Sequence, residues 1–266
     1  MRKILLLLLS LVLIFGSLAF STSNNTATAS TSTVVPLEDG LHMITDTEEK
    51  SEYIMTIDGV QTRYIETIKT IDEKAKDIHT KVYNEETNEL LQDFTTTLVN
   101  DEIADQEVDL LKSLPERNVV DKSNGESYPT LQNKNMIALA SSSVKSNKSL
   151  VGVLGINYTK NFNTGRGTAN YAGLITRYAS LSSSSTFDTH ASAVDSMRGV
   201  ETGTLAGWLI SGFSGGGLVG GKIISWATAK IILKNIAGPL AIASNAWALG
   251  QWFYYYNRIA NNYTKI

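Results

Sequence analysis

Hydrophobic and polar residues alternate with a period of two from Leu41 to Asn100. Within this stretch, the pair Asp58-Gly59 separates two runs that are rich in β-branched and aromatic residues. Such a pair is typical of a two-residue hairpin turn, because both turn residues take positive φ. The pattern turns again at Asn84–Asn88 and then returns. The alternation therefore predicts four or five antiparallel strands in a meander.

Three later segments have helical spacing. Apolar residues of Asp101–Leu114 form one stripe with acids opposite, and Pro115 would end that helix. Thr168–Leu181 places its tyrosines, Leu174 and one isoleucine on one face, and Ala191–Met197 has the composition of a short helix. We therefore expect a helix in each of these three ranges.

A glycine-rich run without charge occupies Thr202–Gly221, with eight glycines in 20 residues. Small residues every four positions line one face of an apolar helix and allow a second helix to approach closely. The candidate contact residues are Gly203, Gly207, Gly212, Gly216 and Gly220. The alternative is a buried Gly-rich loop and helix in a soluble core.

A cationic amphipathic helix is predicted for Lys222–Lys234, because its lysines fall within about a third of the helix circumference. The next run, Asn235–Asn257, has no charge and ends in aromatic residues beside Arg258, which resembles an interfacial belt. The membrane-contact candidates here are Lys222, Trp226, Lys230, Lys234, Trp247 and Trp252. Together the two uncharged runs suggest a hydrophobic hairpin, and the alternative for the second run is an aromatic core helix.

The patterns as a whole predict an α+β protein, with an N-terminal antiparallel β-meander followed by a C-terminal Gly-rich, mainly α-helical hydrophobic domain. The expected divisions are a signal peptide and leader at 1–29, an acidic β-rich domain with a terminal helix at 34–115, a polar linker at 116–150, and a basic Gly/Ala-rich helical domain at 151–266.

Charge separates the two halves of the chain. Residues 38–126 contain 23 acidic and 9 basic residues, a net charge of −14, whereas residues 127–266 contain 3 acidic and 12 basic residues, a net charge of +9. No acid follows Glu201, which leaves 65 consecutive positions without one. Such a partition has two readings: two domains that simply attract each other, or an acidic part, 34–115, that masks the basic part.

The N-terminus has the layout of a signal peptide, with Arg2 and Lys3 before the apolar run Ile4–Phe15. Cleavage is expected after Ala19 or Ala29, and the mature protein is expected to be secreted. The chain contains no cysteine, which excludes disulfides, thiolate metal sites and cysteine nucleophiles.

Three catalytic or nucleotide motifs occur in the glycine run, and each lacks its chemical partners. G-x-S-x-G around Ser214 needs a later acid and histidine, and a P-loop ending at Lys222 needs a Ser or Thr next and an acid for magnesium. A dinucleotide fingerprint at 215–220 needs an acid about 20 residues later. We therefore expect no enzyme, no cofactor and no metal.

The cluster of Asp188, His190 and Asp195 is interpreted as structural rather than as a metal site. Nucleic acid is also not an expected partner, because the positive charge is spread thinly over the second half of the chain.

The cysteine-free exported layout, the segment Val35–Gly40, the acidic β-rich first half and the Gly-rich, Trp-containing basic tail together resemble the large secreted bacteriocins of the geobacillin 26 type. The resemblance covers most of the chain by layout and includes no defined active site. It implies an antibacterial protein that acts on related bacteria, without lanthionine modification.

Two functions from different classes follow. The first is a secreted antibacterial protein whose C-terminal helical region associates with or permeabilises a bacterial membrane of anionic lipid, or meets a cell-envelope receptor. The alternative is a non-toxic exported binding or cell-surface protein with a soluble helical core.

Overall fold

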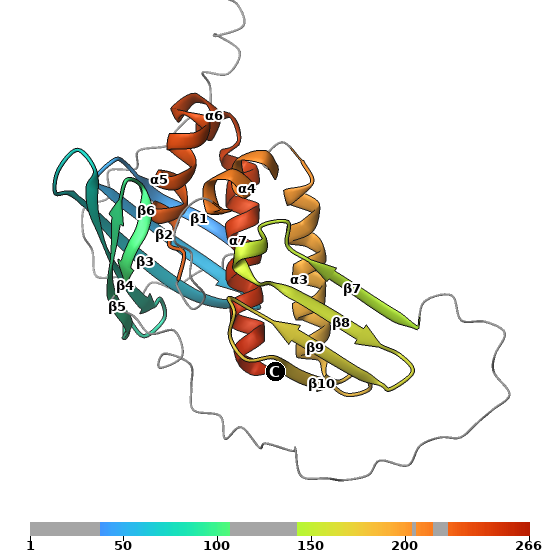
Figure 1. The fold of residues 1–266 in the computed structure, drawn as a ribbon. Coiled ribbons are helices and arrows are strands. Elements are labelled where there is room, and N and C mark those ends of the chain that lie inside the picture. The colour runs from blue at the N-terminus through green and yellow to red at the C-terminus, as the bar shows by residue number, and fades with distance from the viewer. Residues whose placement is uncertain (1–37, 107–142, 204–205, 215–222) are drawn as a thin grey trace, which may run out of the picture. The chain divides into compact units, whose positions relative to one another are not determined.

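The structure, a computed structural model, describes residues 38–106, 143–203, 206–214 and 223–266. Its first part is a six-stranded antiparallel sheet with the strands in chain order (Figure 1). We call it the first sheet, and its strands are β1 Gly40–Asp46, β2 Lys50–Ile57, β3 Val60–Thr70, β4 Ala75–Asn84, β5 Leu90–Val99 and β6 Glu102–Gln106. The predicted antiparallel meander is confirmed, with one strand more than expected.

The local chemistry of the turns explains the meander. Asp58 and Gly59 both have positive φ, 53° and 78°, and join β2 to β3 as the sequence predicts. Asn88 has positive φ in the turn after β4. Short polar and glycine residues adopt this region at little cost, which lets the strands reverse without loss of register.

The predicted helix at Asp101–Leu114 is wrong where the structure describes it. Asn100 and Asp101 take positive φ, and β6 then pairs with β5. Ile103 is buried, so the acid-rich segment places an apolar side chain inward with strand periodicity. Residues 107–114 lie outside the described part.

A second antiparallel sheet follows, in the order β10-β9-β8-β7. Its elements are β7 Val144–Lys148, the 3₁₀ turn η1 Gly152–Leu154, β8 Asn157–Asn161, β9 Arg166–Asn170 and β10 Arg177–Ser180. Sequence patterns did not indicate this sheet, and β7 falls inside the range 116–150, whose composition favours a linker.

The helix expected at Thr168–Leu181 is therefore wrong, because that range contains most of β9 and all of β10. Ala172 and Gly173 reverse the chain with positive φ. Gly167 explains the close packing of β9, since a Cβ there would lie 2.3 Å from ring atoms of buried Phe187.

Five helices make up the rest of the described chain: α3 Ser185–Glu201, α4 Ala206–Ser214, α5 Trp226–Ala237, α6 Pro239–Ser244 and α7 Ala246–Lys265. The short helix expected at Ala191–Met197 is confirmed as part of α3, which begins after the N-cap Ser184. Gly238, with φ of 78°, and Pro239 separate α5 from α6. No helix in these described ranges is long and apolar enough to cross a membrane.

Helix α7 provides the aromatic centre of the core and contacts both sheets (Figure 1). Phe253 meets Tyr53 of the first sheet edge-on at 5.8 Å between ring centroids. Tyr263 packs against Tyr171, which follows β9, at 5.7 Å. Trp252 stacks on Phe213 of α4, so one helix connects the sheets and the preceding helices.

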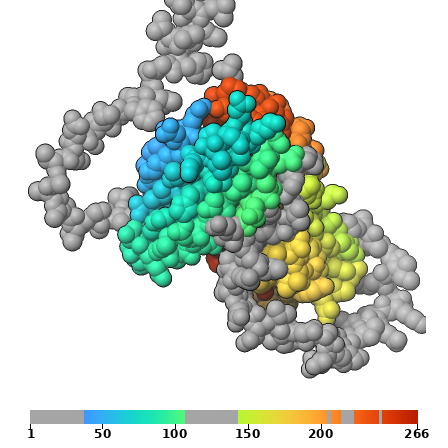
Figure 2. Space-filling model, turned by 60° about the vertical axis from the view of Figure 1, so that its left-hand side comes forward, coloured from blue at the N-terminus to red at the C-terminus, as the bar shows by residue number. Residues whose placement is uncertain are grey.

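The face of the first sheet turned away from this core carries paired charged side chains. Arg63 bridges strands there, with its Nε 3.0 Å from a carboxylate oxygen of Glu85. His79 and Lys81 lie beside Asp93 on the same face. Figure 2 shows the surface over these strands in blue to green, with the orange helices beyond one edge.

Candidate functional site: the contact between the first sheet and helix α5

The site is centred on Glu66, an acidic residue on the buried face of β3. Period-two alternation places Glu66 on the same face as Tyr64 and Ile68. Its cross-strand neighbours are Ser51 on β2 and Thr80 on β4, and all three polar side chains have no exposed surface. A buried carboxyl is costly unless hydrogen-bond donors surround it, so its partners define what it does.

Those partners come mainly from the start of α5. Trp226 N donates to Glu66 Oε1 at 3.1 Å, and Ala227 N donates to Glu66 Oε2 at 2.6 Å. Ser225 Oγ donates at 3.3 Å and Tyr53 OH donates at 2.6 Å. The first N–H groups of a helix have no partner within it, and here a residue 160 positions earlier accepts from two of them.

Ser225 completes this helix cap. Its hydroxyl accepts a hydrogen bond from Thr228 N at 3.3 Å while donating to Glu66. A carboxyl at this end of a helix also interacts favourably with the helix dipole. The N-terminus of α5 is therefore capped partly by its own serine and partly by the first sheet.

Burial raises the pKa of Glu66 to about 7, because a charged carboxylate loses its hydration. The hydrogen bonds from Tyr53, from the two backbone N–H groups and from Ser225 lower the same pKa and offset part of that effect. The phenol of Tyr53 has its pKa raised well above the ordinary value, first by burial and then by the adjacent Glu66. Glu66 therefore changes protonation near neutral pH, whereas Tyr53 stays a neutral donor.

Gln106, at the end of β6, holds the backbone just before α5. Its side-chain Nε2 donates to the carbonyl oxygen of Ile223 at 2.9 Å, and Ile223 N donates to Gln106 Oε1 at 2.8 Å. The side-chain amide of Gln106 thus makes the same two hydrogen bonds to the backbone of Ile223 that a neighbouring strand would make. Thr96 Oγ1 accepts from the same Nε2 at 2.8 Å, which fixes the amide on the sheet.

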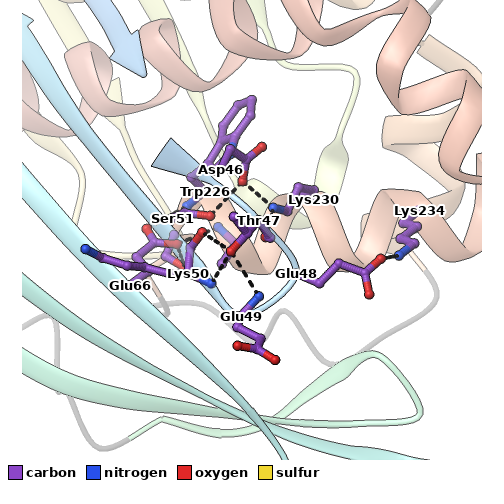
Figure 3. Close-up of polar contacts among 12 residues, drawn as sticks. Asp46, Thr47, Glu48, Glu49, Lys50, Ser51, Glu66, Trp226, Lys230 and Lys234 are labelled. Atoms are coloured by element: carbon purple, nitrogen blue, oxygen red, sulfur yellow. Dashed lines mark hydrogen bonds and ion pairs between the residues drawn. The ribbon is translucent and has the colours of Figure 1, made fainter. Parts of the chain in front are cut away.

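The two described lysines of the predicted cationic helix face the turn between β1 and β2 (Figure 3). Lys230 Nζ pairs with Asp46 Oδ1 and donates to the carbonyl oxygen of Thr47 at 2.9 Å. Lys234 Nζ lies 2.7 Å from Glu48 Oε1. The first pair is mostly buried and the second is exposed, so Asp46 contributes more to the attachment than Glu48.

The turn that carries these acids is held by its own hydrogen bonds. Thr47 Oγ1 accepts from Lys50 N at 2.9 Å and from Glu49 N at 3.3 Å, and Thr47 N donates to the Lys50 carbonyl at 2.8 Å. Figure 3 shows Asp46 and Glu48 directed from this turn toward α5. The acids are therefore presented by an ordered turn.

We use the name clasp for these contacts: Glu66, Gln106, Asp46 and Glu48 of the first sheet with Ile223, Ser225–Ala227, Lys230 and Lys234 of the helical segment.

The candidate glycines have different environments. A Cβ on Gly212 would lie 3.0 Å from Ile236 Cδ1 and 3.2 Å from Leu233 Cδ2, so this glycine lets α4 approach α5. Gly207 is exposed and has no atom within 4 Å of such a Cβ. Gly203 lies exposed after α3. Gly216, Gly220 and Lys222 lie outside the described residues.

The candidate tryptophans also differ. Trp226 is 4% exposed and Trp252 is fully buried, whereas Trp247 is 77% exposed. Trp247 and Gly203 line the same cavity of about 490 Å³ between α3 and α7. The structure thus brings two candidates together there and places two others in the core.

Glu201, the last acidic residue of the chain, is buried and links three separate segments of the fold. Its carboxylate accepts from Ser149 Oγ and Leu150 N at 2.6 Å each, and from Trp252 Nε1 at 3.1 Å. These bonds join the loop after β7 to α3 and α7. Trp252 is therefore tied into the folded core by a polar contact as well as by packing.

Asp188, His190 and Asp195 all lie on α3 and make separate contacts. Asp195 pairs with Lys145, and Asp188 pairs with Lys160. His190 is buried, and burial lowers its pKa. Within the ranges that the structure describes, no group of three metal-ligand residues occurs.

A cavity of about 480 Å³ lies beside the clasp, between the inner face of the first sheet and α7. Tyr53, Ser225, Phe253 and Tyr256 are among its lining residues. Two of these also belong to the surroundings of Glu66, so the buried carboxyl lies close to a space that admits water.

Sequence reasoning missed Glu66 and Gln106. The available signal was positional, because alternation along β3 puts an acid in line with Tyr64 and Ile68 on the apolar face. An acid at an inward position requires donors from another element. Gln106 lay in the segment predicted as a helix, where its pairing with an extended backbone was not foreseeable.

No protein-family model matches this chain, and comparison with curated proteins and with solved structures found no match. The fold itself defines a mixed α+β protein, in which an acidic antiparallel sheet caps and pairs with a cationic helix from an acid-free segment.

Proposed function

We propose that this chain is a secreted antibacterial protein that acts on related bacteria by associating with or permeabilising membranes through its C-terminal helical region. One observation carries the proposal. Helix α5 belongs to a segment without acidic residues, and the acids that pair with Lys230 and Lys234 come from the end of β1 and the turn that follows it. The charge of the helix is thus balanced from outside its own segment.

Separation from the first sheet would leave α5 as a cationic amphipathic helix. Ile231, Ile232 and Leu233 are buried in the folded chain and would supply its apolar side. Such a helix binds an anionic bilayer surface through buried apolar area and lysine charge, at roughly 1 kcal/mol per basic residue near the surface.

Two tryptophans support this interpretation. Trp247 is 77% exposed at the start of α7. Trp226 is buried, yet its Nε1 has no hydrogen-bond partner among the residues that the structure describes. An indole at a membrane interface keeps its ring in an apolar layer while its N–H meets water or headgroups, which this packed position does not provide.

The test is leakage of dye from vesicles of anionic lipid, compared with zwitterionic vesicles and with killing of related bacteria. Lys230→Gln with Lys234→Gln is expected to reduce vesicle affinity roughly thirtyfold, from about 1 kcal/mol per lysine. Lys69→Gln with Lys74→Gln is the matched control, because it makes the same charge change on exposed residues of the first sheet. Absence of leakage and of killing with every protein would exclude the membrane function.

A second function, an exported non-toxic binding protein, is favoured by the packing of α7. Trp252, Phe253, Tyr256 and Tyr263 are at most 1% exposed, as in the core of a stable soluble domain. This alternative predicts a monomer that does not sediment with vesicles of either composition. Co-sedimentation with the anionic vesicles therefore discriminates between the two functions.

A further inference from the structure

We propose that the first sheet is an intramolecular restraint on α5, and that the cost of burying the ionised carboxylate of Glu66, which has no cation beside it among the described residues, favours departure of the helix from the sheet. The membrane destination of the released helix depends on the proposed function, whereas the restraint itself does not. The proposal is drawn from the positions and partners of four side chains on the sheet.

The restraint acts on the backbone that begins α5. Gln106 makes two hydrogen bonds to Ile223, and Glu66 accepts from Trp226 N and Ala227 N. These four bonds all cross from the first sheet to a stretch of five residues. Departure of α5 would break them together and leave two N-terminal N–H groups of the helix without an acceptor.

The lysine contacts extend the restraint along the helix. Lys230 is 16% exposed and pairs with Asp46, one turn beyond the capped end. Lys234 follows one turn later and pairs with exposed Glu48. The contacts weaken toward the C-terminal end of α5, so an opening that starts there reaches Glu66 last.

Glu66 is the member of the clasp that responds to pH. It faces the hydroxyls of Tyr53 on β2, Thr80 on β4 and Ser225 before α5, with Tyr64 next on its own strand. From α7, the Tyr256 hydroxyl accepts from Ile224 N, and on α5 Lys230 is paired with Asp46. Among the described residues no cation pairs with the Glu66 carboxylate, so its negative charge is held by hydrogen bonds alone.

The sign of the pH effect follows from burial. The pKa of Glu66 is about 7 in the folded chain, against 4.5 for an ordinary glutamate. Release into water favours the ionised form, so the equilibrium for opening rises with pH between these values. From pH 6 to pH 8 the expected increase is roughly tenfold.

Amide hydrogen exchange of the intact secreted chain tests the restraint. After correction for the intrinsic rate, the amides of the first turn of α5 should open roughly tenfold more at pH 8 than at pH 6. Glu66→Gln keeps the size of the side chain and should abolish this difference. The amides of α3 are the internal reference and should not follow the same change. Equal exchange of α5 at both pH values in the wild-type chain, or the same pH response in Glu66→Gln, would overturn the proposal.

A surface variant covers the case in which Glu66→Gln does not fold. Asp46→Asn with Glu48→Gln removes the lysine partners and should increase opening of α5 about two- to tenfold. Glu73→Gln with Glu86→Gln makes the same charge change at exposed residues of the first sheet and should leave α5 unchanged. Identical exchange in both variants would also contradict the restraint.

Vesicle binding by the same variants separates this proposal from the proposed function. If α5 opens more readily but no variant binds anionic vesicles, the restraint is supported and the membrane function fails. If the variants bind vesicles while exchange of α5 never responds, the membrane function is supported and the restraint is wrong.

Discussion

Two buried carboxyl groups organise this protein at the scale of single residues. Glu66 caps α5 from a distant strand, and Glu201 joins the loop after β7 to Trp252. Both have no exposed surface. Each accepts hydrogen bonds from backbone N–H groups, which are donors that cannot be removed by a side-chain substitution, so loss of either carboxyl leaves buried donors without partners.

The first prediction concerns the pH dependence that Glu66 gives to folding. Its pKa is raised from 4.5 to about 7, so the stability it contributes is complete below pH 4.5 and is lost as the pH rises through 7. The free energy of unfolding is expected to fall by up to ~3 kcal/mol across that window. Urea denaturation at pH 5 and pH 8 measures it.

The variant Glu66→Gln isolates that contribution. Buried His190 acts in the opposite sense, because its lowered pKa removes stability as the pH falls below about 6.5. The difference between wild type and Glu66→Gln cancels the histidine contribution. A difference that does not vary with pH would show that Glu66 does not titrate in this window.

The second prediction concerns Glu201. Replacement by alanine leaves Leu150 N and Trp252 Nε1 without their acceptor, and we expect a loss of ~2–4 kcal/mol in the free energy of unfolding. Trp252→Phe removes the indole donor, so the two substitutions should be less than additive in a double-mutant cycle. Full additivity in denaturant titrations would argue against this bond.

At the scale of elements, strands β1–β5 of the first sheet were predictable, whereas β6 and the strands of the second sheet were not. Alternation and the Asp58-Gly59 pair report local backbone geometry, and both were confirmed. The ranges Asp101–Leu114 and Thr168–Leu181 contain apolar spacings that suit a helix, but tight turns at Asp101 and Gly173 make strands there. The secondary structure of such short segments depends on the sheet that they join, because strand pairing overrides a weak helix propensity.

The third prediction tests the approach of α4 to α5. Gly212→Leu places a side chain where Ile236 Cδ1 would be 3.0 Å from its Cβ, and we expect a loss of ~1–3 kcal/mol through overpacking. Vesicle leakage by this variant is expected to decrease, because the close contact of the helices is lost. Calorimetry and the leakage assay measure the two effects.

Gly207→Ala is the matched control for Gly212→Leu. It lies on the same helix, and its Cβ would meet no atom within 4 Å. Alanine at an open helical position stabilises by ~0.5–1 kcal/mol. Equal destabilisation by both substitutions would mean that Gly212 has no special role in the contact of α4 with α5.

At the scale of the whole molecule, the division of charge between the two halves corresponds to ion pairs that connect them. The first sheet supplies acids to helices of the basic half at Lys230, Lys234 and Arg258, the last through Asp58 at 2.9 Å. Most of these pairs are at least partly exposed, so salt weakens them. The acidic half therefore neutralises part of the acid-free segment at the points of contact.

The fourth prediction is that cutting the chain within residues 116–142, ahead of β7, increases its binding to anionic vesicles. The cut removes the covalent tether between the halves, so the attraction that remains should decrease with salt. Co-sedimentation before and after cleavage, at low and physiological ionic strength, measures the effect. Equal binding of cut and intact protein would reject masking by the acidic half.

Sequence patterns alone predict the antiparallel meander, the Asp-Gly hairpin, the helical character of the C-terminal segment and the division of charge. These properties depend on neighbouring residues or on composition, which periodicity and counting report directly. Long-range packing places Glu66 at the cap of a helix 160 positions later, buries Trp252 while leaving Trp247 exposed, and brings Lys230 to Asp46. An alternating pattern identifies which side of a strand is covered, but the identity of the covering element depends on how distant surfaces fit, and that information is not local.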